Sequence, residues 1–332
     1  MFNSKELYMS THRTKNLGGT RKSRYANILL DEAFKVILCS PENEKLLIKI
    51  IELLIPGKKI SSLTLRDKEQ HGLALTDKNV NFDLYCTSES GEQFIVEMQY
   101  SGQASYADLM LCYATYPIRA QLSKKIRAYR RDWVSRVFRR KPRAKMDYSL
   151  MPVYVVSLLN FTMPHESDDA LEEGLISRYD IRNAGNGEQL TNALHFMFLE
   201  IGRFKIGYEE KDKCTTLLEK FVYSLKYSQE LKERPEGFRE ELLVLLYEAM
   251  EYANLSIGKQ LKYDKIMTTQ IDIIARQDYA REEGLKQGIE QGIEQGAEQK
   301  TVEIARQMLA KGISAEIVSE CTGLSAEEIA AL

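Results

Sequence analysis

The sequence predicts an α/β fold followed by a mostly helical C-terminal region. Amphipathic helical segments come first, strand-like segments follow, and the run at 150–161 is almost continuously apolar. Such a run is typical of a central strand covered on both faces. Helices, strands, a further helix and a buried strand, in this order, indicate a sheet with helices packed on it.

The folded part of the chain is predicted to begin with two helices, at 26–39 and 41–55. Apolar residues recur at helical spacing in both segments, and Pro56 and Gly57 end the second. The preceding residues, 1–24, are polar and basic, which predicts a disordered basic tail.

Strands are predicted at 59–65, in a hairpin at 80–103 and at 150–161. β-Branched and aromatic residues favour strands in these segments. Between the last two lies a tyrosine-rich helix, predicted at 104–122. This helix separates the hairpin from the buried strand, as an α/β order requires.

From about residue 190 the pattern predicts helices throughout, including one at 190–204. In the segment 276–299 glycine recurs every fourth residue, beside larger apolar residues. Each glycine inside a helix costs about 1 kcal/mol relative to alanine. The segment is therefore a linker, which we favour, or a helix whose small residues allow close packing. Residues 300–332 predict a small helical module with N-caps at Ser314 and Ser325.

Composition excludes several classes of site. The four histidines are isolated, and the five cysteines lack Cys-x-x-Cys spacing, which argues against zinc sites and disulfides. We expect Cys39, Cys86 and Cys112 to be buried and reduced. No window of about 18 residues lacks charges, and the N-terminus has no apolar run that suits a signal peptide. We therefore expect a cytoplasmic protein with no membrane contact and with carboxylate chemistry.

A basic insertion lies at about 119–147. Between Arg119 and Lys145 there are twelve Lys or Arg and one acid, so this segment carries +11 and the rest of the chain −13. Apolar residues recur within it at helical spacing, which predicts a helix that presents its cations to phosphates. A solvated basic helix or a disordered insert is the alternative. The predicted DNA-binding residues are Lys124, Lys125, Arg127, Arg130, Arg131, Arg139 and Arg140.

The hairpin carries two carboxylates where burial is expected. If residues 89–91 form a three-residue turn with Gly91 in the left-handed region, paired residue numbers sum to 180. Asp83 then lies opposite Glu97. A two-residue turn would instead place Asp83 opposite Met98.

In the first register one face of the hairpin is polar and the other is apolar. Asp83, Glu97 and Gln99 share the first face, while Phe82 belongs to the second. Opposed Cβ atoms lie about 4.5–5.5 Å apart, so two carboxylates there can bind one Mg²⁺ together with water and phosphate. Two solvated carboxylates on a half-exposed face are the alternative.

The motif around Asp83 and Glu97 resembles the PD-(D/E)xK nuclease core, in the variant with glutamine in the lysine position. More particularly, the chain from about residue 25 to its end resembles the Rpn family of recombination-promoting nucleases and transposases. The motifs that carry this resemblance are D-x-x-F-K at 31–35, F-D-L-Y-C-T at 82–87, V-E-M-Q at 96–99, Y-P-I-R-x-Q at 116–121, P-V-Y-V-V-S-L-L-N-F at 152–161, F-x-F-L-E-I-x-x-F at 196–204, the glycine tetrads and the closing G-I-S…T-G-L-S-x-E-E-I.

The resemblance implies a metal-dependent DNA endonuclease, a phosphodiesterase that uses Mg²⁺ or, as a substitute, Mn²⁺. Asp83 and Glu97 would bind the metal, and Gln99 would orient the attacking water. Asp31 and Lys35 on the first helix would complete the site. A helix N-cap is the alternative role for Asp31, and a solvated lysine the alternative for Lys35.

The resemblance also implies a restriction-endonuclease-like core, with a mixed central sheet flanked by helices, over residues 25–275. Its substrate would be double-stranded DNA, cut to promote recombination or mobile-element movement, and a homodimer would suit double-strand cleavage. The alternatives are a catalytically lapsed DNA-binding or interaction protein and an antiphage defence nuclease. The last predicted helix, S-A-E-E-I-A-A-L, begins with two glutamates, so we expect the module at 300–332 to serve interaction or packing rather than DNA reading.

Overall fold

The computed structural model describes residues 23–38, 40–66, 69–70, 80–103, 105–139, 145–165 and 174–332. The chain divides into two compact units, residues 1–266 and 267–332. The predicted tail at 1–24 lies outside the described residues except for its last two. Of these, Arg24 forms an ion pair with Glu251 at 2.8 Å, so it is fastened to the first unit.

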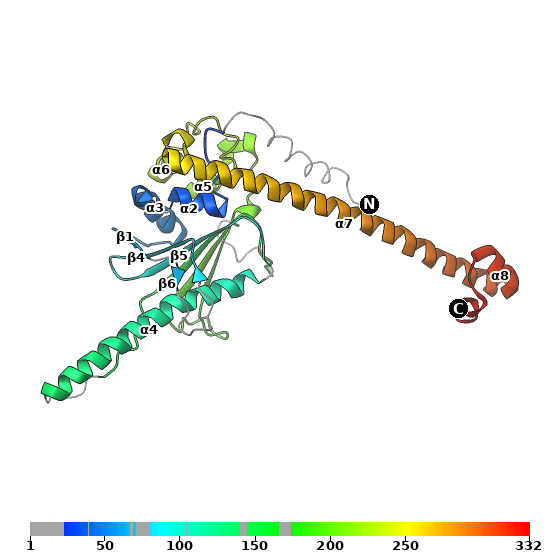
Figure 1. Cartoon of the computed structure of the whole chain (residues 1–332), viewed down its shortest axis with the longest axis horizontal. Coiled ribbons are helices and arrows are strands. Elements are labelled where there is room, and N and C mark those ends of the chain that lie inside the picture. The colour runs from blue at the N-terminus through cyan, green and yellow to red at the C-terminus, as the bar shows by residue number, and fades with distance from the viewer. Residues whose placement is uncertain are drawn as a thin grey trace. The chain divides into compact units, whose positions relative to one another are not determined.

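A six-stranded mixed sheet forms the centre of the first unit (Figure 1). Its strands are β1 (Leu63–Leu65), β4 (Leu84–Ser88), β5 (Gln93–Gln99), β6 (Val153–Leu159), β7 (Ile176–Asp180) and β8 (Leu194–Glu200). They lie in the order β1-β4-β5-β6-β8-β7. Strands β5, β6 and β8 are parallel to one another, whereas the pairs β1–β4, β4–β5 and β7–β8 are antiparallel. A separate antiparallel pair consists of β2 (Glu69–Gln70) and β3 (Val80–Asn81).

Every residue of β6 is buried, which confirms the central strand predicted at 150–161. The helix predicted at 190–204 is wrong, because this segment contains β8, which pairs with β6 and β7. Six of the seven residues of β8 are buried. A short apolar run that is covered on both faces cannot be assigned to helix or strand by periodicity, and its aromatic content favours a strand.

Helices cover both faces of the sheet. In Figure 1, α2 (Asp31–Leu38), α3 (Glu44–Leu54), α5 (Leu217–Lys226) and α6 (Glu241–Met250) lie on one face, and α4 (Tyr106–Arg139) lies on the other. The first helix predicted, 26–39, is thus shorter than expected. Helix α2 packs against β5 and α4 against β6. The 3₁₀ turns are η2 (Pro41–Asn43), η4 (Ile201–Arg203), η5 (Tyr208–Lys213) and η6 (Tyr252–Asn254).

The tyrosine-rich helix and the basic segment form the single helix α4, 34 residues long. Its first part packs on the sheet through Tyr106, Met110 and Ala114. Farther along, the chain that follows the helix runs back beside it, since the Gln121 amide exchanges two hydrogen bonds with the backbone of Met151, at 2.8 and 3.1 Å. The basic segment therefore prolongs a core helix.

Two of the three cysteines predicted to be buried can be compared with the structure. Cys86 is buried in β4, as predicted, whereas Cys112 is exposed on α4. The apolar pattern around Cys112 continues beyond the face of α4 that meets the sheet, which explains the error. Cys39 lies outside the described residues.

The second unit contains the end of α7 (Ile257–Ala310), then α8 (Ala315–Thr322) and α9 (Ala326–Ala330). Helix α7 runs through the whole glycine repeat, so the segment 276–299, for which we favoured a low-complexity linker, is helical. The predicted capping box of Ser325 and Glu328 is confirmed, while Ser314 is an N-cap without a side-chain hydrogen bond. None of the helices in the described part of the chain combines the length and apolar character needed to cross a bilayer.

Candidate active site

The hairpin has the register in which paired residue numbers sum to 180. Leu84 pairs with Val96 in the β4–β5 ladder, and Ser88 N–H donates to the Glu92 carbonyl at 2.9 Å. Gly91 closes the loop with φ +87°, a conformation that favours glycine. The three-residue turn is confirmed. Because the ladder reaches its end at Leu84, the next residue, Asp83, faces Glu97.

The predicted division of the hairpin into a polar and an apolar face is wrong at Phe82. A bend at Asp83 precedes β4 and interrupts the alternation of side chains. Phe82 consequently belongs to the cluster under α4 that contains Tyr85 and Ile95. Its ring centroid lies 5.4 Å from that of Tyr113 on α4. Both faces of the hairpin are therefore core, and the carboxylates lie within it.

Asp83 and Glu97 are both buried, with 5% and 2% of their surfaces exposed. This burial excludes the alternative of two solvated carboxylates. Each carboxylate accepts a hydrogen bond from the backbone of the opposite strand: Asp83 N–H donates to Glu97 Oε1 at 3.2 Å, and Met98 N–H donates to Asp83 Oδ2 at 2.9 Å. The hairpin backbone thus fixes the two acids side by side.

The proximity of the two acids changes the acidity of Glu97. Burial raises the pKa of Glu97 well above its ordinary value, and the negative charge of Asp83 raises it further. The N–H of Asp83 and the charge of Lys35 act in the opposite direction without cancelling the rise. The site therefore resists a second negative charge unless a cation joins it.

Helix α2 supplies one cation to the pair. The Lys35 ammonium lies 3.0 Å from Asp83 Oδ1 and 2.8 Å from Glu32 Oε1. Burial lowers the pKa of Lys35, but these two carboxylates more than compensate, so the pKa is raised and the side chain stays charged. The alternative of a solvated lysine is thus excluded, although the prediction of its place beside the site came from the resemblance alone.

Asp31 reaches the end of β5 from the same helix. It is the first residue of α2, and its Oδ1 accepts a hydrogen bond from Tyr100 N–H at 3.1 Å. Burial raises the pKa of Asp31, and the charge of Asp83 adds to the rise. Asp31 therefore joins helix to strand beside the carboxylate pair.

Gln99 is the last residue of β5 and lies on the same strand face as Glu97, two residues on. Its side chain is partly exposed and forms no hydrogen bond with any residue in the described part of the chain. The amide is therefore available at the edge of the site.

Two hydroxyl groups beside Glu97 were not predicted. Ser157 on β6 is the register partner of Glu97, and Tyr106 begins α4 on the same face of the sheet. One signal could have found Ser157, since it is the single polar residue in the strand V-Y-V-V-S-L-L. Tyr106 has no such signal, because tyrosines recur along its helix.

The acids present fit a magnesium site better than a structural metal centre. Among the described residues no group of three or more His, Cys, Asp and Glu is arranged to hold a metal ion. Mg²⁺, however, is usually held by one or two carboxylates and completes its shell with water and substrate phosphate. Asp83 and Glu97 supply that donor set. The Tyr106 and Ser157 hydroxyls beside them have no hydrogen-bond partner, so they are polar groups that could take part in a metal-bound site.

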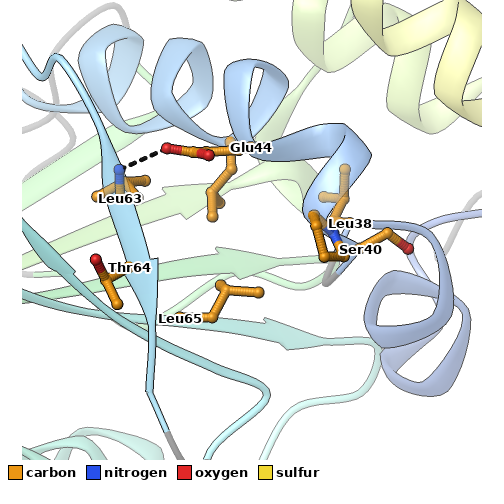
Figure 2. A pocket seen from close by; sticks show the side chains of 8 residues that line it. Leu38, Ser40, Glu44, Leu63, Thr64 and Leu65 are labelled. Carbon is orange, nitrogen blue, oxygen red and sulfur yellow. Dashed lines mark hydrogen bonds between the residues drawn. The ribbon is translucent and has the colours of Figure 1, made fainter.

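A pocket elsewhere on the first unit is separate from this site. It lies between the α2–α3 corner and the edge strand β1, where Glu44 Oε1 accepts a hydrogen bond from Leu63 N–H at 2.7 Å (Figure 2). None of the predicted catalytic residues lines it.

The predicted DNA-binding residues lie on the distal half of α4. Lys124, Arg127, Arg130 and Arg131 are exposed. Lys125 instead forms an ion pair with Asp147 at 2.6 Å, so its positive charge is neutralised within the protein. Arg139 ends α4, and Arg140 lies outside the described residues.

Comparison with known proteins gives two matches to family models. Residues 28–280 match a model described as PD-(D/E)XK nuclease family transposase, and residues 298–332 match one described as Rpn/YhgA-like nuclease family, C-terminal HTH domain. The second match favours a helix-turn-helix domain at 298–332, and thus DNA reading, which we had ranked below interaction or packing because the last helix begins with two glutamates. Searches of curated proteins and of solved structures found no significant match. The first match covers most of the chain. The protein therefore belongs to the PD-(D/E)XK nuclease family transposases, within the Rpn group of nucleases.

Proposed function

We propose that this protein is a Mg²⁺-dependent DNA endonuclease that hydrolyses phosphodiester bonds and thereby promotes recombination or mobile-element movement. The observation that carries the proposal is the buried pair Asp83 and Glu97, which face each other on one hairpin, Asp83 just before β4 and Glu97 within β5. Two buried carboxylates in contact destabilise a fold, so their presence is explained best by a role that needs them.

Asp83 and Glu97 would hold the metal ion, and Mn²⁺ would substitute for Mg²⁺. Nucleases of this superfamily generally use divalent ions. When bound, the ion lowers the pKa of the attacking water and offsets negative charge on the phosphate.

The other site residues would orient the reactants. Gln99 would hold the attacking water with its free amide oxygen, next to Glu97 on the same face of β5. Asp31 would keep α2 against the end of β5 through Tyr100 N–H. Lys35 would hold Asp83 and face the charged phosphate. In the reaction water attacks phosphorus and the bond from phosphorus to the leaving oxygen breaks.

The exposed cations of α4 would bind the DNA backbone. Arg127, Arg130 and Arg131, which we call the outer arginines, are exposed, and none is in an ion pair with another described residue. Arginine binds phosphate with two parallel hydrogen bonds, and several such contacts on one helix would hold a duplex. Cleavage of both strands by a domain with one site would require two copies of the chain.

The proposal is tested by incubating supercoiled plasmid with the full-length protein and Mg²⁺ or Mn²⁺. Asp83→Asn and Glu97→Gln keep the shape of each side chain and remove its charge, and both are expected to abolish nicking and linearisation. Glu92→Gln, in the same hairpin but paired with Lys58 at 2.7 Å, is the matched control and should cut like wild type. Equal amounts of supercoiled DNA after incubation with wild type and with both site variants would refute the nuclease.

A second function, DNA binding without cleavage, is favoured by one observation. The ammonium of Lys35 already neutralises Asp83, as expected for a fold that keeps its acids without a metal. The match of residues 298–332 to a helix-turn-helix domain is compatible with this function. A gel-shift assay in EDTA separates the two, since retention of a duplex by a protein that never cuts it in Mn²⁺ would support binding alone.

A further inference from the structure

The site contains two buried hydroxyls without hydrogen-bond partners. Tyr106 is 2% exposed and Ser157 is fully buried. Neither hydroxyl reaches hydrogen-bond geometry with any residue that the structure describes. Buried hydroxyls are nearly always satisfied, so two orphaned hydroxyls in one place indicate an absent partner.

Both hydroxyls lie beside Glu97. Ser157 is the register partner of Glu97 across the β5–β6 pair, and partners in a parallel ladder project to the same face. Tyr106 packs on that face from the start of α4. Burial raises the pKa of Tyr106, the nearby Ser157 hydroxyl acts in the opposite direction, and the Glu97 and Asp83 carboxylates raise the pKa further, so the four groups are neighbours. The Tyr106 and Ser157 hydroxyls are thus close to each other but fall short of hydrogen-bond geometry.

An apolar cluster surrounds this neighbourhood. Met110 and Ala114 of α4 and Phe198 of β8 share a cluster with Tyr106, and Phe198 is also the register partner of Ser157. In such surroundings phenylalanine at 106 and alanine at 157 would remove unsatisfied donors and stabilise the fold in its metal-free form. Packing alone therefore gives no reason for either hydroxyl.

We infer that Tyr106 and Ser157 are positioning residues for Glu97, whose hydroxyls donate hydrogen bonds to the Glu97 carboxylate when a divalent cation occupies the site. The inference rests on the proposed function. Carboxylates that bind metals are commonly held by hydrogen bonds from a surrounding shell of donors, which fix their orientation. Glu97 Oε1 already accepts Asp83 N–H, so the two hydroxyls supply donors for an ionised carboxylate that turns toward a cation.

The test uses Tyr106→Phe and Ser157→Ala in the full chain, each of which deletes one hydroxyl and little else. Thermal unfolding in EDTA reports the stability of the metal-free fold, and calorimetric titration with Mn²⁺ reports metal binding. Each variant is expected to be at least as stable as wild type in EDTA and to bind Mn²⁺ about 10–100-fold more weakly. A purely structural role would not weaken metal binding while it left stability intact.

Tyr85→Phe is the matched control. Tyr85 lies in the same cluster on the same face, but its hydroxyl already donates to Gln93 Oε1. Its loss should lower stability in EDTA and leave Mn²⁺ affinity unchanged.

If wild type binds Mn²⁺ and both variants bind it as tightly, the positioning role is wrong although the proposed metal site stands. If wild type shows no Mn²⁺ binding, the metal-dependent function fails and the inference fails with it. If both variants unfold at lower temperature in EDTA than wild type, the hydroxyls have partners in the metal-free fold, and the inference is also overturned.

Discussion

Glu97→Gln is expected to stabilise the metal-free protein while it abolishes cleavage. Glutamine has the shape of glutamate and retains an oxygen that can accept Asp83 N–H, so the change removes chiefly a charge. Opposed side chains on a hairpin lie about 5 Å apart. At an effective dielectric constant of about 20, two like charges at that distance repel by about 3 kcal/mol. Lys35 offsets part of this repulsion, which leaves an expected gain of about 1–3 kcal/mol.

The gain depends on pH in a defined direction. Because the pKa of Glu97 is raised in the folded state, the stability that this one group contributes is full below the ordinary carboxyl pKa of about 4.5 and is lost as the pH rises through the folded value. Glu97→Gln has no such group to ionise. The difference in unfolding free energy between the two proteins should therefore increase above about pH 4.5 and reach its maximum at alkaline pH.

The assay is urea or thermal unfolding in EDTA at a series of pH values, with Tm expected to rise by about 2–4 °C per kcal/mol. Glu92→Gln is the control of opposite sign, since it breaks the ion pair with Lys58 and should destabilise. A Glu97→Gln protein that is less stable than wild type at pH 8, or a difference that does not change with pH, would refute the reasoning.

Three further predictions concern other parts of the chain. Gly202→Ala would place a Cβ 2.6 Å from the carbonyl carbon of Phe161, so urea unfolding should show a loss of about 1–3 kcal/mol, whereas Gly258→Ala in open helix should not destabilise. Hydrogen bonds that the Glu89 carboxylate accepts from backbone N–H groups lower its pKa to about 2. These N–H groups should therefore lose protection in hydrogen exchange as the pH falls from about 4.5 to 2, and Glu89→Gln should remove that pH dependence. Replacing the three outer arginines with glutamine should reduce the slope of log K against log salt by about 2–3, measured by fluorescence anisotropy with duplex DNA; an unchanged slope would exclude α4 as the DNA interface.

Sequence predicted the elements whose signals are local. The hairpin register followed from Gly91, because a left-handed glycine after a type I turn fixes the pairing. The buried strand β6 followed from its length and apolar content. The strand β8 was missed, because a run covered on both faces has no period that separates strand from helix. The break in alternation at Phe82 was also missed, since the bend that causes it depends on packing under α4.

In the candidate site, too, residues close in sequence were predicted from local signals, and contacts between distant segments were not. Asp83 and Glu97 lie on one hairpin, so local spacing was enough to bring them together. The contact between Lys35 and Asp83 joins segments 48 residues apart, and only the resemblance to a family suggested that Lys35 belongs to the site.

The position of Ser157 shows what a stricter sequence rule could still find. A polar residue in the middle of a strand that is buried on both faces costs stability unless it is satisfied. Glu97 in β5 and Ser157 in β6 are two such interruptions, and a parallel ladder aligns them side by side. Two neighbouring interruptions in buried strands are therefore better evidence for a site than either alone, because packing would remove each independently. That argument makes Ser157 the first residue to test once Asp83 and Glu97 have been shown to bind a metal.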